Sequence, residues 1–243
     1  MSRQTRYLIF LTINLTVLSS GCAARLSEPA APAVASVPCR GGTLQSDADA
    51  AAYAGCRSVT GHLRIRKSSL TDLDALSQLR HVSGTLEISD NPELEDLRGL
   101  SRLQSVGALE VRGNPQLEDL RGLESLRQAK NVRVEANGIY DTVGLAGLNE
   151  VGALVVKDNP RLISLRGFKG LQRAQSVEIR NNPRLAAYYG LLPQLQQVEE
   201  RFELRHNAGL SKREVREVRE RIERSSDQPT VVAREAQRQT ALR

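Results

Sequence analysis

Apolar residues recur in pairs along this chain, with a single position between the two members of each pair. Between residues 59 and 210 the pair returns at steps of 23, 23, 23, 22, 23 and 25 residues. Alternation predicts a short β-strand with one face inward, and a fixed period of this length predicts a solenoid. We therefore predict seven stacked rungs, whose apolar pairs are Leu63/Ile65, Leu86/Ile88, Leu109/Val111, Val132/Val134, Leu154/Val156, Val177/Ile179 and Phe202/Leu204.

A turn column follows each pair and predicts a corner at the end of each strand. The turn is Asn-Pro, Asn-Gly or Asn-Ala in every rung except the first, where Lys67-Ser68 stands instead. A stacked asparagine can hydrogen-bond corner backbone that has no ladder partner. Beyond the corner the apolar positions come every third residue, which favours 3₁₀ turns or short extended pieces over a long α-helix. The best example of this spacing is Leu117, Leu120, Leu123 and Leu126.

Both ends of the repeat region carry signs of caps. We expect residues 39–58 to form an N-terminal cap with a short helix over 46–53. Ser211 to Glu214 reads as a capping box, so a helix over 211–225 should cover the last rung, as an open solenoid end requires. Its apolar stripe is Val215, Val218 and Ile222. The polar tail over 226–243 should be disordered.

Three glycines mark a further feature of the repeat. Gly84, Gly107 and Gly152 occupy equivalent places ahead of the apolar pairs. We expect them to precede the strands, where the backbone bends sharply.

The N-terminus predicts export. A basic start precedes an apolar run over residues 7–18, which is too short for a typical membrane-spanning helix and is typical of a secretory signal peptide. The segment that follows, residues 19–22, reads Ser-Ser-Gly-Cys and resembles the lipobox of bacterial lipoproteins. That resemblance implies cleavage after Gly21 and lipidation of Cys22. Because Ser19 stands where the family prefers an aliphatic residue, ordinary cleavage near Ala24 or a retained anchor is the alternative.

The export signal also predicts where in the cell the protein is located. Residues 1–21 are the expected signal peptide, and residues 22–38, rich in alanine and proline, read as a tether that holds the domain off a membrane. The residue after the cysteine is Ala23 rather than aspartate, which by resemblance to enterobacterial sorting implies the outer membrane. The face of that membrane is left open.

Cysteine usage agrees with export. If Cys22 carries lipid, Cys39 and Cys56 remain as an even pair just before the first rung. In an exported chain a disulfide is the expected state, and its loop of about 17 residues gives about 3 kcal/mol of stability. The alternative is a redox or metal pair, but neither cysteine lies in a Cys-x-x-Cys motif or near two histidines.

Charge and composition argue against a nucleic-acid partner. The formal net charge is +6, yet within residues 59–210 there are 20 lysines and arginines against 19 aspartates and glutamates. The basic excess is therefore not concentrated on the repeats, and aromatic residues, at 3%, are too few to make stacking platforms.

Catalytic chemistry finds little support. His62, His81 and His206 are scattered and form neither a metal spacing nor a triad, and there is no glycine-rich phosphate loop. The pairs Glu95-Asp96 and Glu118-Asp119 suggest a calcium site or acid–base catalysis. Each pair, however, occupies the same position in its repeat and lies near an arginine, which favours solvent-exposed corners held by salt bridges. We expect no enzyme activity, metal or cofactor.

The outward positions of the predicted strands form two columns. The first reads Arg64, Glu87, Glu110, Arg133, Val155, Glu178 and Glu203, and the second reads Arg66, Ser89, Arg112, Glu135, Lys157, Arg180 and Arg205. Stacked strands bring neighbours to about 5 Å, so the second column is a mostly basic ridge. One interpretation is a binding face for an anionic polymer or an acidic protein; the other is a solvated face whose charges pair across strands, as Glu110 with Arg133.

An irregularity lies near the end of the repeats. Tyr188-Tyr189 replaces an expected leucine and is the best aromatic candidate for a contact, with packing in the cap as the alternative. The candidate binding face is therefore Arg66, Arg112, Arg133, Lys157, Arg180 and Arg205, with Tyr188 and Tyr189.

The repeat resembles a known family. Residues 56–65, Cys-Arg-Ser-Val-Thr-Gly-His-Leu-Arg-Ile, are similar to the opening rung of receptor L domains, the ligand-binding solenoids of insulin-receptor and epidermal-growth-factor-receptor ectodomains. The pattern Val-x-Gly-x-Leu-x-Ile continues through 106–111 and 151–156 in a form that is one residue shorter, Val-Gly-x-Leu-x-Val, and the likeness spans about 39–210. It implies a right-handed β-solenoid with several narrow sheets, used for binding.

These observations leave two hypotheses for function. The first is a binding or adhesion module anchored to a bacterial cell envelope by lipid on Cys22, with a protein or envelope polysaccharide as its partner. The second is a structural envelope scaffold without a discrete ligand.

Overall fold

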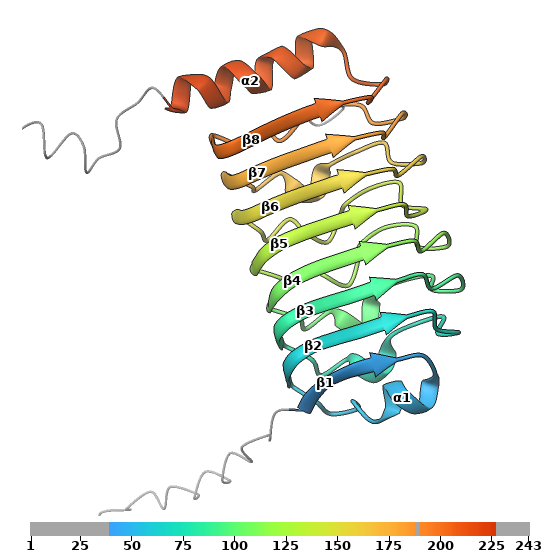
Figure 1. Ribbon diagram of the computed structural model, residues 1–243. Helices are drawn as coiled ribbons and strands as arrows, with labels where there is room; N and C mark the ends of the chain where they lie inside the picture. The colour runs from blue at the N-terminus through green and yellow to red at the C-terminus, as the bar shows by residue number, and fades with distance from the viewer. Residues whose placement is uncertain (1–38, 188–189, 227–243) are drawn as a thin grey trace, which may run out of the picture. The chain divides into compact units, whose positions relative to one another are not determined.

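One parallel β-sheet organises the part of the chain that the structure describes, residues 39–187 and 190–226 of a computed structural model. Its eight strands follow one another in chain order, so each turn of the chain adds one strand beside the last (Figure 1). The predicted mainly-β solenoid is confirmed. The strands are β1 Cys39–Leu44, β2 Ser58–Arg66, β3 His81–Ser89, β4 Ser105–Arg112, β5 Gln128–Glu135, β6 Glu150–Lys157, β7 Arg173–Arg180 and β8 Gln197–Arg205.

The apolar pairs stack in register and build the core. Leu63 pairs with Leu86, and Leu86 with Leu109, all fully buried. The return path of each rung uses the spacing of three: Leu117, Leu120 and the leucines after them are also fully buried. Three of these returns contain short 3₁₀ helices, as the spacing predicts. They are η1 Asp74–Leu76, η2 Arg98–Leu100 and η3 Arg166–Phe168.

The number of sheets differs from what the family resemblance implies. The described residues form one sheet, and outside it only an isolated bridge joins Asp141 to Ser164. The physical reason lies in the return segments, which close on themselves through local turns. Leu100 N–H, for example, donates to the carbonyl of Leu97 at 2.8 Å, and Leu103 N–H donates to that of Leu100 at 2.9 Å. Groups that bond within a rung are not free to extend a ladder between rungs.

A ladder of buried asparagines fixes the corners. Each asparagine side chain donates to the carbonyl of the last inward strand residue in the preceding rung, as Asn114 Nδ2 does to Ile88 of β3 at 3.0 Å. Its Oδ1 accepts the backbone N–H of the previous asparagine, as from Asn91 at 3.1 Å. Ser68 begins the ladder, because its N–H and hydroxyl both donate to Asn91 Oδ1. The ladder residues are Asn91, Asn114, Asn137, Asn159, Asn182 and Asn207.

The residue before each ladder position adopts the left-handed conformation. Ala136 has φ +53°, and six other residues at this place have φ between +49° and +65°. Few non-glycine residues adopt this region, so the sharp corner carries backbone strain in most rungs. The six are Lys67, Asp90, Gly113, Asp158, Asn181 and His206.

The predicted position of three glycines is wrong. Gly84, Gly107 and Gly152 lie inside β3, β4 and β6 rather than ahead of them. The reason is close backbone approach between rungs: a Cβ on any of them would lie 2.7 or 2.8 Å from a carbonyl oxygen of the preceding rung.

The N-terminal cap contains an extra strand. The predicted disulfide joins Cys39 to Cys56, with a Cα–Cα distance of 6.0 Å. It ties β1, which pairs with β2 as the first strand of the sheet, to the end of a loop that holds helix α1 (Asp47–Ala51). Ser46 caps α1 through a capping box with Asp49. The alternation in β1 is broken by its two glycines, which is why the pattern did not reveal this strand.

A helix covers the other end, as predicted. In α2 (Lys212–Ser226), Ser211 N–H donates to Glu214 Oε2 at 2.7 Å and Glu214 N–H donates to Ser211 Oγ at 3.2 Å. Val218 and Ile222 are buried in the core. Arg221 donates to three backbone carbonyls of the last return segment, those of Leu191, Leu192 and Leu195.

Several predictions concern residues outside those described. They are the signal peptide over 1–21, lipidation of Cys22, the tether over 22–38, the pair Tyr188-Tyr189, and the tail from 227 onward. No helix among the described residues is long and apolar enough to cross a membrane.

Candidate functional site

The strand register brings the two predicted charged columns into line. Arg64 lies beside Glu87, Glu87 beside Glu110, and Glu110 beside Arg133. The second column aligns likewise from Arg66 to Arg205. The six basic residues of the predicted binding face therefore lie on the same side of the sheet.

Glu87 is the centre of a charge network on this face. Its carboxylate accepts hydrogen bonds at 2.8 Å from both Arg112 and Ser89, and Arg64 lies 3.5 Å away. Only 8% of Glu87 is exposed. Burial raises the pKa of this carboxyl, but the bonds from Arg112 and Ser89 outweigh it and hold the pKa below its ordinary value.

All but one of the remaining cations of the predicted binding face are paired in the same way. Glu135 accepts Lys157 at 2.8 Å and Arg133 at 3.4 Å, so Arg133 pairs within its own strand rather than with Glu110. Arg180 pairs with Glu178 at 2.6 Å, and Arg205 with Glu203 at 3.1 Å. Among the residues described, Arg66 alone of the six forms no ion pair. The ridge is thus largely neutralised by its own acidic neighbours.

The acidic residues at the corners form hydrogen bonds and ion pairs within their own turns. Asp96 accepts the N–H of Arg98 at 2.8 Å, and its other oxygen lies 3.6 Å from that arginine's guanidinium. Asp119 and Arg121 repeat the arrangement at 2.8 and 3.4 Å. These distances agree with the interpretation of salt-bridged corners.

The three histidines lie in separate rungs and make local bonds. His62 Nδ1 accepts the N–H of Thr85 at 2.9 Å, and His81 Nδ1 lies 2.9 Å from Ser105 Oγ. His206 Nδ1 contacts Asn181 Oδ1 at 3.2 Å. Each ring therefore joins neighbouring rungs.

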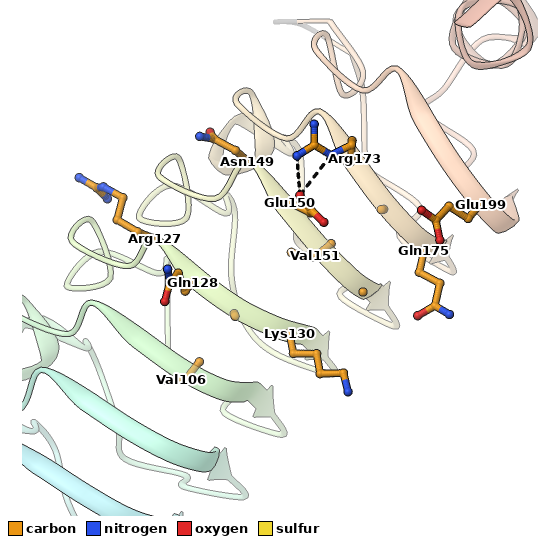
Figure 2. A pocket seen from close by; sticks show the side chains of 13 residues that line it. Val106, Arg127, Gln128, Lys130, Asn149, Glu150, Val151, Arg173, Gln175 and Glu199 are labelled. Atoms are coloured by element: carbon orange, nitrogen blue, oxygen red, sulfur yellow. Dashed lines mark hydrogen bonds and ion pairs between the residues drawn. The ribbon is translucent and has the colours of Figure 1, made fainter. Parts of the chain in front are cut away.

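An open groove of about 620 Å³ lies over the starts of strands β4 to β8. Its floor is the buried column Val106, Ala129, Val151 and Ala174. Alanine replaces valine at two of these four positions, which lowers the floor under β5 and β7. Figure 2 shows the polar side chains that surround it, which come from β5 to β8 and the loops before them: Arg127, Gln128, Lys130, Asn149, Glu150, Arg173, Gln175 and Glu199.

A glycine opens the middle of the groove. Asn131 pairs with Ala153 and Ala153 with Ser176, so the positions just before them, Lys130, Gly152 and Gln175, lie side by side on β5, β6 and β7. Lys130 and Gln175 are exposed and extend to the same side (Figure 2). Because Gly152 has no side chain, a trough runs between them.

Charges on the groove are only partly paired. Arg173 donates to Glu150 Oε2 at 2.6 and 3.1 Å, and both side chains are more than half exposed. Gln175 donates to Glu200 at 2.7 Å. Neither Arg127 nor Lys130 forms an ion pair with any residue that the structure describes.

The sequence analysis missed this groove. Its residues come from the strand starts and the loops before them, ahead of the alternating positions that reveal which face is exposed. The available signals were small: alanines at 129 and 174 in a column of valines, and glycines at 107 and 152 on either side of Lys130.

Comparison with known proteins finds one family model that matches part of the repeat region. Residues 55–166 match the model of one family, described as Receptor L domain. The match extends from just before β2 to the start of η3 and confirms the resemblance seen in the sequence. No curated protein and no solved structure matches the chain.

Proposed function

We propose that this protein is a non-enzymatic ligand-binding module, held at a bacterial cell envelope by lipid on Cys22. The observation that carries the binding role is the receptor L domain match over residues 55–166, since the family suggests a ligand-binding module. The address rests on the sequence of residues 1–22, whose apolar run and terminal cysteine resemble a lipoprotein signal.

The structural framework suits such a role. Stacked rungs fix the strand face through ladder bonds, the buried asparagines and the closed ends, so an exposed site on it needs little ordering when a ligand binds. The groove at the strand starts adds a concave surface with convergent polar groups, which is the usual form of a binding site.

The alternative, a structural scaffold without a discrete ligand, draws support from the ridge. Five of the six cations of the predicted binding face already pair with glutamates of the same face, and a partner would have to displace those pairs. A protein that spaces other envelope components needs a rigid rod with a solvated surface, and this face would serve.

In-cell cross-linking followed by affinity capture separates the two functions. The full chain, tagged at its C-terminus, is cross-linked in a bacterial host and isolated under denaturing conditions. A single partner recovered in stoichiometric amount supports the binding module. Recovery of bulk envelope material alone contradicts it and supports the scaffold.

Mass spectrometry of the mature N-terminus tests the anchor. A first residue Cys22 carrying a diacylglyceryl thioether is the expected result, and the Cys22→Ser variant should lose both the thioether-linked lipid and cleavage after Gly21. A lipid-free N-terminus beginning after Cys22 would remove the lipid anchor from the proposal while leaving the binding role untouched.

A further inference from the structure

We propose that the groove over β5 to β7 binds an extended acidic peptide segment, whose carboxylates meet Arg127 and Lys130. The inference rests on the proposed binding function and assigns it a site and a ligand class. It departs from the sequence-based expectation, which placed binding on the basic ridge.

The shape of the groove favours an extended chain. Gly152 leaves a trough along the start of β6, bounded by Lys130 on β5 and Gln175 on β7. Gly107 on β4 lies on the other side of Lys130. Both strand neighbours of this lysine, Gly107 and Gly152, are therefore glycines, and neither has a side chain beside it. A peptide in extended conformation fits a trough that follows one strand, because alternate side chains then point to the two walls.

The charge of the groove favours an acidic ligand. Its lining holds Arg127, Lys130 and Arg173 against Glu150 and Glu199, a net charge of +1 from three cations and two carboxylates. The carboxylate of Glu150 is occupied by Arg173. Arg127, just before β5, and Lys130 on β5 therefore lie at the groove without acidic partners among the described residues, unlike most cations of the ridge.

Arg127 is held in place before any ligand arrives. Its guanidinium donates to the backbone carbonyls of Glu124 and Leu126. The same group occupies the space that a side chain at position 147 would need, and Gly147 stands there. A guanidinium fixed in this way retains further N–H donors for a carboxylate, and its prior ordering lowers the entropic cost of binding.

The neutral groups distinguish a peptide from a glycan. Gln128, Asn149 and Gln175 supply amides, which both donate and accept and so complement a peptide main chain. None of the residues lining the groove is aromatic, so the stacking surface that sugar rings and bases use is missing from it.

The test uses fluorescence anisotropy with the mature protein and a labelled peptide of alternating glycine and glutamate. We expect binding with a Kd below about 100 μM at low salt, and at least about tenfold weaker binding of the matched glycine–glutamine peptide. Lys130→Glu should weaken binding at least about tenfold. Lys169→Glu makes the same charge change on η3's flank, outside the groove, and should leave binding unchanged.

Three results would overturn the proposal: equal affinity of the Lys130→Glu and Lys169→Glu proteins, equal affinity for the glutamate and glutamine peptides, or tighter binding of polygalacturonate than of the peptide. Thermal unfolding of both variants confirms that each is folded. If cross-linking recovers the same partner from wild type and Lys130→Glu, the binding module stands and the groove assignment falls. If the peptide binds as expected and cross-linking recovers no partner, the groove assignment stands and the proposed function as a binding module falls.

Discussion

Removing one asparagine from the middle of the ladder should destabilise the whole solenoid. Asn114 is fully buried, and its side chain forms bonds in both directions along the stack. Its Nδ2 donates to Ile88 O at 3.0 Å and to Asn137 Oδ1 at 3.0 Å, while its Oδ1 accepts Asn91 N–H at 3.1 Å. The substitution Asn114→Ala deletes all of these bonds without changing the strands.

The magnitude follows from the groups left behind. The buried N–H of Asn91 loses its side-chain acceptor, which costs about 1–3 kcal/mol. The carbonyl of Ile88 and the Oδ1 of Asn137 each lose one donor, at about 0.5–1 kcal/mol apiece. We therefore expect Asn114→Ala to lower the free energy of unfolding by about 2–5 kcal/mol.

Ser68→Ala is the matched control at the start of the same ladder. The Ser68 hydroxyl donates to Asn91 Oδ1 at 2.7 Å, but Ser68 N–H donates to the same oxygen at 3.1 Å and remains after the substitution. The expected loss is only about 0.5–1.5 kcal/mol, because no buried donor is orphaned.

Equilibrium urea unfolding followed by far-ultraviolet circular dichroism measures both variants. Hydrogen exchange adds a local readout, since protection should fall most in the peptides that hold β3, β4 and their corners. If Asn114→Ala cost no more than Ser68→Ala, the asparagine ladder would not be a principal source of stability, and the reasoning from buried unsatisfied groups would fail.

Four further substitutions, one of them a control, probe the backbone and the charged face. Gly122→Ala should cost at least about 2 kcal/mol in urea unfolding, because its Cβ would overlap the Leu97 carbonyl, whereas Gly55→Ala, at similar φ in open space, should cost only about 1. Ala136→Gly should raise stability by about 0.5–1 kcal/mol by relieving a left-handed alanine; a loss would contradict this. For Glu87 the lowered pKa means that stability present above its ordinary value of 4.5 is lost as pH falls through the folded-state pKa, and Glu87→Gln should flatten that part of the acid unfolding curve.

The scaffold could be predicted from sequence because burial determines it. Inward positions must be apolar in every rung, so the leucine and isoleucine columns repeat at a readable period. The asparagine column repeats for the same reason, since one unsatisfied corner would weaken both neighbours. The exception also belongs to the ladder: Ser68 begins it by donating its N–H and its hydroxyl to Asn91 Oδ1.

The exposed chemistry could be predicted only in part. The two charged columns were placed correctly, because alternation determines which side chains share a face. Which carboxylate each cation pairs with was not fully predictable: Arg133 lies beside Glu110 in register but pairs with Glu135 of its own strand, and its rotamer decides this. A column that reads as basic in sequence is therefore nearly neutral as a surface.

The same reasoning explains where a binding site can arise on such a scaffold. A cation is available to a ligand where the neighbouring rungs offer it no carboxylate. Lys130 meets this condition because its neighbours at the same register are Gly107 and Gly152. Lys157 does not, because Glu135 occupies the adjoining position on β5 and lies 2.8 Å from its Nζ. Removing side chains from two rungs thus exposes a charge more effectively than adding a further basic residue to a strand whose neighbours are acidic.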